Sequence, residues 1–538
     1  MRFDRNRLIS PQNYDTMRKL SPLFLLVLLL GLSGCASLPT GIERTVSSHR
    51  DRDGEPSRTA ADTAPYLTKH QGKSGFWLLG DGLDAYAARI LLTETADRTI
   101  DVQYYLYHND ITGQILTYRL LRAADRGVRV RLLLDDMATK GIDTPLATLD
   151  THPNIEVRIA NPYANRGFRT LETLARFDTV TRRMHNKSFS VDNSMTIVGG
   201  RNIGDEYFGT HEDVNFGDMD VLAMGPVAAK VGAQFDLYWN SELAYPIHSL
   251  TDSQGNLDTL RRDLKELYEA HRDSPYAQRA RNSDLVRKFV AGTLPFQWGH
   301  ALVFYDLPEK LVTDPEDRST HLGPKVRPYT LGAVKRDLLI FSPYFVPGKE
   351  GVMVLTDLEK RGVRVRLLTN SLASTDVGAV HAGYAKYRKP LLQGGVEIFE
   401  FKPDADTPRR GKFAKLRGSS GASLHAKTSV FDREALFIGS PNLDPRSGKL
   451  NTEFGILFES EPLAKGLADW FDENQAHIAY RVSLDRSQCK NEHRCEERLQ
   501  WTDEEGGREV IYLKEPKTGV LIRFFVSLVS LLPIEGQL

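Results

Sequence analysis

The chain has 538 residues, of which 41% are hydrophobic and 26% charged. These are the proportions of an ordinary globular protein, and the length exceeds what one core accommodates. Lys plus Arg and Asp plus Glu both number 70, which argues against a nucleic-acid-binding protein, although a local basic pocket is still compatible with this balance.

The N-terminal residues carry the pattern of an export signal. A basic stretch at 17–19 precedes an apolar run at 20–32, which is shorter than a bilayer-spanning helix requires. The sequence Leu-Ser-Gly-Cys at 32–35 resembles a bacterial lipobox, in which Cys35 is acylated. A plain signal peptide that contains a cysteine is the alternative. Ala36, by resemblance to lipoprotein sorting signals, favours the outer membrane over the inner membrane.

We therefore expect residues 1–34 to be a signal peptide with a lipobox and residues 35–75 to be a polar linker from the lipid anchor. The residues before Met17 add nothing to the signal, so Met1 and Met17 are both candidate starts. The mature protein would be lipid-anchored in the bacterial envelope and face the periplasm.

From Phe76 onward the chain repeats itself. The octapeptide RGVRVRLL occurs at 126–133 and again at 361–368, each time after a strand-like and then a helical run. Strand–helix–strand units of this kind predict parallel strands joined by right-handed crossovers. The predicted fold class is therefore α/β, with two duplicated lobes at 76–300 and 301–480. Each lobe would hold a mixed, largely parallel sheet flanked by helices, and 481–538 would be a C-terminal extension.

A second pair of matching segments carries the chemistry. Both segments have the pattern H-x-K, four residues, D, six residues, G, then Gly or Ser, any residue, and N. The first copy comprises His185, Lys187, Asp192, Gly199, Gly200 and Asn202; the second comprises His425, Lys427, Asp432, Gly439, Ser440 and Asn442. Residues two apart on a strand share a face, so the imidazole and the ammonium point the same way. Such a face is a phosphate site built without metal, and a small residue at 199 would leave room for the ligand.

The duplicated motif resembles the HKD motif of the phospholipase D superfamily. The segments "MHNKSF", "VGGRNIGDEYF" and "GASLHAKT" are similar to its bacterial cardiolipin synthase C-type branch. The resemblance implies two phospholipase D-like lobes whose motifs meet at a pseudo-twofold interface. It also implies catalysis through a phosphohistidine, with His185 as nucleophile and His425 as acid and base.

The other motif residues follow from the same resemblance. Lys187, Lys427, Asn202 and Asn442 would hold the nonbridging phosphate oxygens, with Gly199, Gly200 and Ser440 completing the phosphate-binding loops. A carboxylate about thirty residues downstream would orient each histidine. Glu453 fits for His425, and Asp218 fits for His185 with Asp220 as the fallback. Asp192 and Asp432 belong to the motif, but we expect them to brace the hairpins.

Weaker signals lie elsewhere. Cys489 and Cys495 predict one small-loop disulfide in an exported protein; a metal site would need more ligands than the nearby His493. Asp135 and Asp136 end a strand, and we expect solvated carboxylates there in preference to a metal site.

Two further segments leave alternatives open. His381 could line a headgroup pocket or lie on a surface helix. The apolar residues of 520–533 recur at helical spacing, so this segment would pack on the domain or lie in the membrane interface.

Taken together, these features predict an exported enzyme that transfers a phosphatidyl group to an alcohol. Cardiolipin would be the product, with phosphatidylglycerol as acceptor and phosphatidylethanolamine or a second phosphatidylglycerol as donor. No metal or organic cofactor is expected, because protein cations would do the electrostatic work. The alternatives are a phospholipase D that releases phosphatidic acid, a nuclease of the same superfamily, which the neutral net charge disfavours, and a catalytically silent lipid-binding envelope scaffold.

Overall fold

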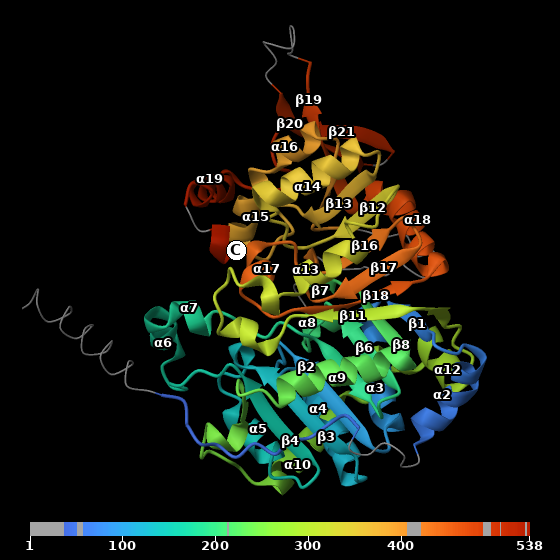
Figure 1. The fold of residues 1–538 in the computed structure, drawn as a ribbon, viewed down its shortest axis with the longest axis vertical. Coiled ribbons are helices and arrows are strands. Elements are labelled where there is room, and N and C mark those ends of the chain that lie inside the picture. The colour runs from blue at the N-terminus through green and yellow to red at the C-terminus, as the bar shows by residue number, and fades with distance from the viewer. Residues whose placement is uncertain are drawn as a thin grey trace, which may run out of the picture.

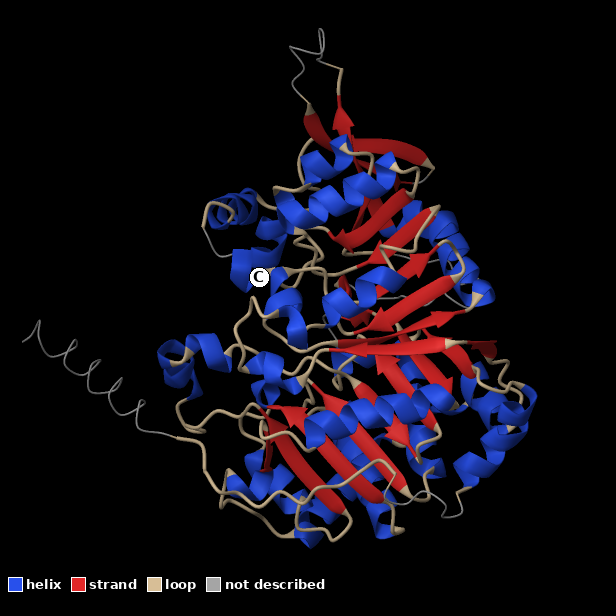
Figure 2. Ribbon diagram, in the orientation of Figure 1, coloured by secondary structure: helices blue, strands red, loops and turns tan. Residues whose placement is uncertain are grey.

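The computed structural model describes residues 37–50, 57–211, 215–405, 421–487, 497–505, 507–532 and 535–538. The signal peptide, Cys35, Cys489 and Cys495 lie outside these residues. Two α/β lobes stack along the longest axis, the first blue to green and the second yellow to red (Figure 1). Helices flank both sheets (Figure 2), so the predicted fold class is confirmed.

Within the described residues, the sheet of the first lobe has nine strands in the order β10-β1-β8-β6-β5-β2-β3-β4-β9. The strands are β1 (Ser74–Leu79), β2 (Thr99–Tyr104), β3 (Arg129–Asp135), β4 (Ile155–Ala160), β5 (Ser188–Val191), β6 (Met195–Gly199), β8 (Asp220–Met224), β9 (Ala244–Pro246) and β10 (Gln297–Gly299).

The described part of the second lobe has a ten-stranded sheet in the order β11-β18-β17-β16-β12-β13-β14-β19-β20-β21. The strands are β11 (Ala301–Tyr305), β12 (Asp337–Phe341), β13 (Arg364–Asn370), β14 (Glu397–Phe401), β16 (Thr428–Phe431), β17 (Ala435–Gly439), β18 (Phe454–Glu459), β19 (Ala479–Asp485), β20 (Arg498–Glu505) and β21 (Arg508–Tyr512).

Parallel pairing among the described strands of these sheets is confined to β2–β3–β4 and β12–β13–β14. It is less extensive than the sequence pattern predicts, because each motif adds an antiparallel hairpin, β5–β6 or β16–β17. In both lobes the hairpin pairs with the first strand of the parallel set, so the motif lies beside the carboxyl end of that strand.

The helices cover the sheets and the lobe surfaces. Those of the first lobe are α2 (Arg58–Lys69), α3 (Gly82–Thr95), α4 (Ile111–Asp125), α5 (Asp143–Leu149), α6 (Arg169–Ala175), α7 (Phe177–Val180), α8 (Asp205–Phe208), α9 (Pro226–Trp239), α10 (Leu257–His271), α11 (Pro275–Arg281) and α12 (Asp284–Val290). Those of the second are α13 (Leu322–Val326), α14 (Gly348–Lys360), α15 (Gly378–Ala385), α16 (Arg388–Gln393), α17 (Pro445–Lys449), α18 (Glu461–Ile478) and α19 (Val520–Val529). No helix of the described ranges has both the length and the apolarity to cross a membrane.

Each lobe has its own apolar core, and a further core joins the two lobes. This shared core includes Phe76 and Val221 of the first sheet and Ile438 and Phe458 of the second, all at most 1% exposed. The rings of Phe76 and Phe458 stack with centroids 4.2 Å apart. Beside it, β7 (Asn215–Gly217) and β15 (Ala422–Leu424) form a two-stranded parallel sheet across the interface. The lobes are therefore fixed relative to each other by apolar burial and by backbone hydrogen bonds.

Two segments differ from their expected roles. The described part of 35–75, expected to be a linker, includes α2, and Ser57 at its N-cap donates a hydrogen bond of 2.8 Å to the Asp192 carboxylate. In the segment expected to be an extension beyond residue 480, β20 and β21 continue the second sheet. Polar edge strands of this kind give a weak sequence signal, because one of their faces is solvated.

Candidate active site

The two motif histidines are held at the lobe interface by backbone of the opposite lobe. The His185 N–H donates to the Thr452 carbonyl at 2.9 Å, and the His425 N–H donates to the Gly217 carbonyl at 2.7 Å. Burial is the main cause that lowers the pKa of His185, and the charges of Lys427 and His425 from the second motif lower it further. The structure thus brings the two predicted imidazoles into one site.

The carboxylates that orient the histidines are exchanged between the lobes. His185 Nδ1 lies 2.9 Å from Glu453 Oε2, and His425 Nδ1 lies 2.6 Å from Asp218 Oδ2. The predicted pairing within each lobe, Asp218 with His185 and Glu453 with His425, is therefore wrong. The cause is the backbone pairing just described, which places residues 217–218 beside His425 and residues 452–453 beside His185. Asp220, the fallback, pairs with Arg89 at 2.9 Å instead.

Glu453 is itself fixed by second-lobe groups. Its carboxylate accepts hydrogen bonds from the Ser447 hydroxyl at 2.8 Å and from the Ser440 hydroxyl. Its backbone N–H donates to Asp306 at 2.7 Å, and Asp306 pairs with Lys310 at 2.9 Å. Ser440, expected to bind phosphate, thus gives its hydroxyl to the carboxylate behind His185.

The glycine pair of the first motif makes room for carboxylates of the same lobe. A Cβ at Gly199 would lie 2.1 Å from Asp220 Oδ1, and one at Gly200 would lie 2.2 Å from Asp218 Oδ1. The sequence interpretation gave the space at Gly199 to a ligand, but the Asp220 side chain and the neighbouring backbone occupy it. Both glycines allow the β6 and β8 backbones to approach closely enough to position Asp218.

The two motif lysines are buried beside the histidines. Lys187 Nζ donates to the His185 carbonyl at 2.6 Å, and Lys427 Nζ donates to the His425 carbonyl at 2.8 Å. Lys427 Nζ also lies 3.1 Å from each ring nitrogen of His425. Burial lowers the pKa of Lys427 to about 8 and the pKa of Lys187 well below its usual value. Two buried ammonium groups therefore lie beside the two imidazoles.

The two asparagines differ in their partners. Asn202 Oδ1 accepts from the Leu106 N–H at 3.1 Å, and its amide donates to the Tyr207 hydroxyl at 2.8 Å. Asn442 has its backbone N–H bonded to Ser447, and its buried Oδ1 has no partner among the described residues. Asn202 is thus held in one orientation by the protein itself.

Burial favours the neutral form of both histidines. It lowers the pKa of His185 well below the usual value, and Lys187 and Lys427 lower it further. Burial and Lys427 also lower the pKa of His425, while Asp218 acts in the opposite direction.

The pKa values of the two carboxylates that contact these histidines shift in opposite directions. Burial alone would raise the pKa of Asp218, but His425 and Lys427 bring it below its usual value. Burial raises the pKa of Glu453 to about 7. Asp218 is therefore an ionised partner for His425, whereas Glu453 titrates near neutrality beside His185.

The motif aspartates lie in the hairpin turns. Asp192 accepts hydrogen bonds from the N–H groups of Asp97, Arg98 and Thr99 at 2.8–3.1 Å, and Asp432 accepts from those of residues 335–337 at 2.7–3.2 Å. Both have positive φ angles, 51° and 53°, which a short polar side chain tolerates. Their carboxylates bind the start of the adjacent strand, as expected of braces.

Sequence reasoning missed the aromatic groups around the imidazoles. The Tyr105 ring lies 4.9 Å from that of His185, and the rings of Tyr207 and Phe216 lie 5.2 and 5.1 Å from that of His425. Tyr207 follows the first motif closely, and Tyr105 follows the first parallel strand. The sequence signal that could have identified these aromatic residues is their position at a strand end or near the motif.

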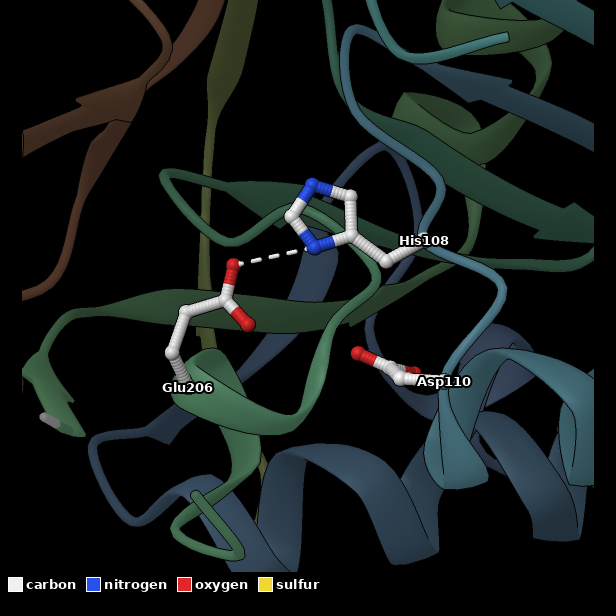
Figure 3. A group of neighbouring side chains, drawn as sticks. All are labelled: His108, Asp110 and Glu206. Atoms are coloured by element: carbon white, nitrogen blue, oxygen red, sulfur yellow. Dashed lines mark ion pairs between the residues drawn. The ribbon is translucent and has the colours of Figure 1, made fainter. Parts of the chain in front are cut away.

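One group of described side chains has the geometry to hold a metal ion. Ligand atoms of His108, Asp110 and Glu206 lie within 4.8 Å of one another (Figure 3). Asp110 already caps α4 by accepting from the Gly113 N–H at 2.9 Å, and it also accepts from the Asp205 N–H at 2.7 Å. His108 Nδ1 lies 3.3 Å from Glu206. These contacts account for the cluster without an ion.

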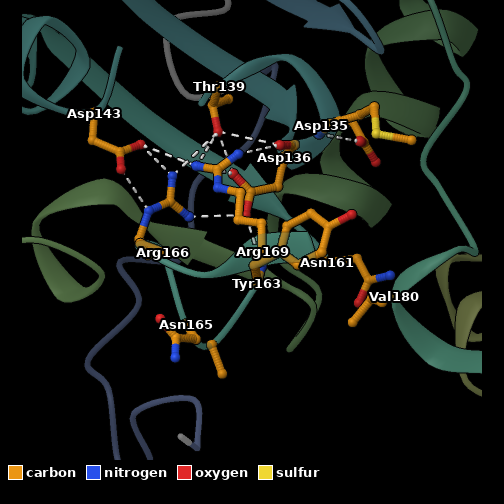
Figure 4. A network of polar contacts seen from close by, with 12 residues as sticks. Asp135, Asp136, Thr139, Asp143, Asn161, Tyr163, Asn165, Arg166, Arg169 and Val180 are labelled. Carbon is orange, nitrogen blue, oxygen red and sulfur yellow. Dashed lines mark hydrogen bonds and ion pairs between the residues drawn. The ribbon is translucent and has the colours of Figure 1, made fainter. Parts of the chain in front are cut away.

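The strand-end carboxylates Asp135 and Asp136 are buried, so the expectation of solvated groups is wrong. Asp135 pairs with Arg183 at 2.8 Å, and Asp136 pairs with Arg166 at 2.9 Å in the network of Figure 4. Arg183 lies two residues before His185, so this network fixes the approach to the first motif.

His381 is buried as well. Its Nε2 lies 3.1 Å from Glu515, so it ties α15 to the segment after β21 and does not lie on a surface helix.

Comparison with known proteins finds a family model and relatives that match the chain. A family model described as "Cardiolipin synthase, PLD-like domain" matches residues 90–239 and 330–474. Cardiolipin synthase C of Escherichia coli (strain K12) is 42% identical over 484 residues, which are 89% of this chain and 100% of the relative. An uncharacterized protein of Helicobacter pylori (strain ATCC 700392 / 26695) is 35% identical over 78% of this chain and 83% of its own.

A solved structure shares the fold. The phosphatidylserine synthase of Haemophilus influenzae Rd KW20 superposes with a TM-score of 0.51 over 78% of this chain and 91% of that chain, at 14% sequence identity.

Proposed function

The chain belongs to the cardiolipin synthase family with phospholipase D-like domains, and from this premise we propose that it joins two phospholipids into cardiolipin by transferring a phosphatidyl group. Phosphatidylglycerol is the acceptor, and phosphatidylethanolamine or a second phosphatidylglycerol is the donor. The observation that carries the proposal is the exchanged pair of histidine–carboxylate contacts at one interface between two complete motifs. A silent scaffold would have no use for both.

The first step forms a covalent intermediate. With Nδ1 bonded to Glu453, Nε2 of His185 is free to attack the donor phosphorus. The bond from phosphorus to the headgroup oxygen breaks, and this oxygen takes the Nε2 proton of His425, which begins the step as an imidazolium stabilised by Asp218. The phosphatidyl group is then carried on His185, and the free headgroup alcohol leaves.

The second step reverses the roles. The hydroxyl of phosphatidylglycerol gives its proton to His425 and attacks phosphorus, and the bond to His185 breaks. Lys187 and Lys427 neutralise the nonbridging oxygens in both steps, since they lie beside the two rings.

The electrostatics support this division of roles. A nucleophile must be neutral, and burial together with two lysines favours neutral His185. A proton carrier needs a partner that stabilises its cation, and Asp218 remains ionised beside His425.

The localisation that fits this activity is a membrane surface. The predicted lipobox cysteine, Cys35, would anchor the exported chain in the envelope facing the periplasm, with the outer membrane favoured. Helix α19 would add an interfacial contact, because Leu521, Phe524 and Leu528 are 84%, 68% and 52% exposed. Replacing these three residues with serine tests α19 better than deleting residues 519–538, because Leu538 also binds Arg446.

The test is an assay with purified protein in vesicles of phosphatidylethanolamine and phosphatidylglycerol, each labelled in turn. Cardiolipin carrying the label supports the synthase. Label from the phosphatidyl group of phosphatidylethanolamine identifies that lipid as donor, whereas label from phosphatidylglycerol alone indicates a second phosphatidylglycerol as donor. Phosphatidic acid as the sole product would support the alternative hydrolase, which has water in place of the acceptor alcohol. If neither cardiolipin nor phosphatidic acid is formed, the proposed activity is refuted.

A further inference from the structure

The buried side chains of helix α6 are polar, whereas the buried residue of the short helix α7 is the apolar Val180. Glu172 is 1% exposed and accepts hydrogen bonds from the N–H groups of Ala164 and Asn165 at 3.0 and 2.6 Å. Arg169 is 7% exposed and donates to the Asp136 carbonyl at 2.8 Å, within the network of Figure 4. The usual amphipathic arrangement, with apolar side chains toward the core, is inverted in α6.

Large apolar side chains gather on the outer side of this segment. Phe168, Leu174 and Phe177 are 60%, 68% and 44% exposed within ten residues of chain. Single exposed apolar residues are common, but a group of them on one short segment marks an interaction surface. The buried ion pairs already hold the segment on the lobe, so its apolar side chains are available for another contact.

Helix α19 presents a similar surface from the second lobe. It packs against α15 through Val526, its one buried side chain among the described residues, and most of its large apolar side chains face outward. Figures 1 and 2 show α6–α7 and α19 projecting on the same side of the molecule, with the chain end between them.

Arg446 contacts the chain next to both of these surfaces. Its guanidinium donates to the carbonyl of Thr181, the residue after α7. Its backbone N–H donates at 2.8 Å to the carbonyl of Leu538, which follows α19 in the chain. Arg446 is also among the cations that lower the pKa of His185. Arg446 precedes Ser447, whose hydroxyl donates to Glu453 behind His185, so the chain beside both apolar surfaces is tied to the residues of the site, and we take this side as the one from which a lipid headgroup arrives.

The start of the described chain lies on the same side as α6. Residues 37–40 line a cavity with Tyr163, Ala164 and Arg166, the segment that leads into α6. Cys35, the predicted acylation site, lies two residues before Ser37 in the sequence.

From these observations we propose that α6–α7 is a second bilayer-docking element, which acts together with α19 to seat the active-site entrance on the membrane. The occupant of both surfaces is the boundary between lipid headgroups and acyl chains. The proposal rests on the proposed function in that its substrates are membrane lipids. Because each lobe contributes one contact with the bilayer, the orientation of the active-site entrance is fixed. With a single helix as the contact, the molecule could rotate about that helix.

The test is hydrogen exchange of the full chain with and without vesicles of phosphatidylethanolamine and phosphatidylglycerol. Vesicles should slow exchange at 168–181 and 520–529 and leave α12 unchanged, since α12 carries the exposed Val290 away from the entrance. Protection at 520–529 alone would overturn the proposal. This readout needs no turnover, so it can succeed or fail independently of the proposed activity.

Activity provides a second readout. The double variant Phe168→Ser with Leu174→Ser should lower turnover on vesicles about tenfold and leave turnover on dispersed short-chain lipids unchanged. The matched control is Val290→Ser with Met353→Ser, whose side chains are 74% and 63% exposed elsewhere. Equal vesicle activity in both double variants would also overturn the proposal, and would favour a protein partner as the occupant of α6–α7.

Discussion

At the residue scale, the central feature is that each histidine is oriented by a carboxylate from the other half of the chain. Hydrogen bonds from Nδ1 to Glu453 and Asp218 orient both rings, and Nε2 of His425 lies 3.1 Å from Lys427 Nζ. The two pairs are related by pseudo-symmetry but differ in charge, because the pKa of Glu453 is raised to about 7 and that of Asp218 is lowered. The difference is consistent with the distinct tasks proposed for the two imidazoles.

This assignment makes His185→Ala and His425→Ala distinguishable. Both should lose at least 10³-fold in cardiolipin formation, because each lacks one step of the double displacement. With a donor whose leaving group needs no proton, such as a p-nitrophenyl phosphodiester, His425→Ala should still accumulate labelled enzyme, and His185→Ala should not. If His185→Ala accumulates label instead, His425 is the nucleophile and His185 is the acid and base.

The pH dependence should reflect Lys427. Burial lowers the pKa of its ammonium to about 8, so the cation is lost as pH rises through this value. We expect kcat/KM, which reports the free enzyme, to fall above about pH 8. Lys427→Arg should move this decline to higher pH even at a reduced rate, because arginine stays charged. An unmoved decline would assign it to another group.

The exchange of carboxylates could not be predicted from the sequence. The spacing from each histidine to its downstream acid is similar in both halves, so sequence alone favours pairing within a half. The actual pairing depends on the β7–β15 contact between the lobes. The motif residues themselves were found because two copies with equal spacing leave little room for chance.

At the element scale, each motif hairpin is fixed to its sheet by an aspartate in its turn. Asp192 satisfies three consecutive backbone N–H groups, residues 97–99, and binds Ser57 of the segment that leads into α2. This is a structural role, and it accounts for an acidic residue at a fixed place in the motif without a part in the chemistry.

Asp192→Ala should therefore destabilise the protein. Removing the acceptor leaves buried N–H groups unpaired, and we expect the free energy of unfolding to fall by about 2–4 kcal/mol. Denaturant unfolding measures this, with the exposed Asp178→Ala as control, expected to change it by less than about 0.5 kcal/mol. A normal stability with lost activity would instead give Asp192 a part in the chemistry.

The strand–helix–strand units were predictable at this scale. The edge strands of the second sheet and the N-terminal segment were not. The two RGVRVRLL segments contribute to the buried strands β3 and β13, and their repetition identifies them although each strand carries a buried arginine, Arg131 or Arg366. Residues 37–50 and β20–β21 are polar and depend on contacts with distant parts of the chain, such as the 2.6 Å contact between His49 and Asp236. Local pattern carries no information about such partners.

At the scale of the whole molecule, the site is built from protein cations that both lobes contribute. We therefore expect EDTA treatment to leave cardiolipin formation within about twofold of the untreated rate, because Lys187 and Lys427 supply the charge that a metal would otherwise provide. Loss of activity that one divalent ion restores would contradict this.

His108→Ala provides the companion measurement. It removes one of the three side chains that could hold an ion, and should leave EDTA resistance unchanged. If the unmodified protein is sensitive to EDTA and the variant is not, a metal would be located at that cluster.

The exchanged carboxylates also govern when the enzyme becomes active. A chain that has folded its first lobe alone holds His185 with no acid behind it, and the second lobe alone is equally incomplete. On the proposed mechanism, catalytic competence requires both lobes to be folded, so a nascent or half-unfolded molecule would leave the lipids around it unchanged.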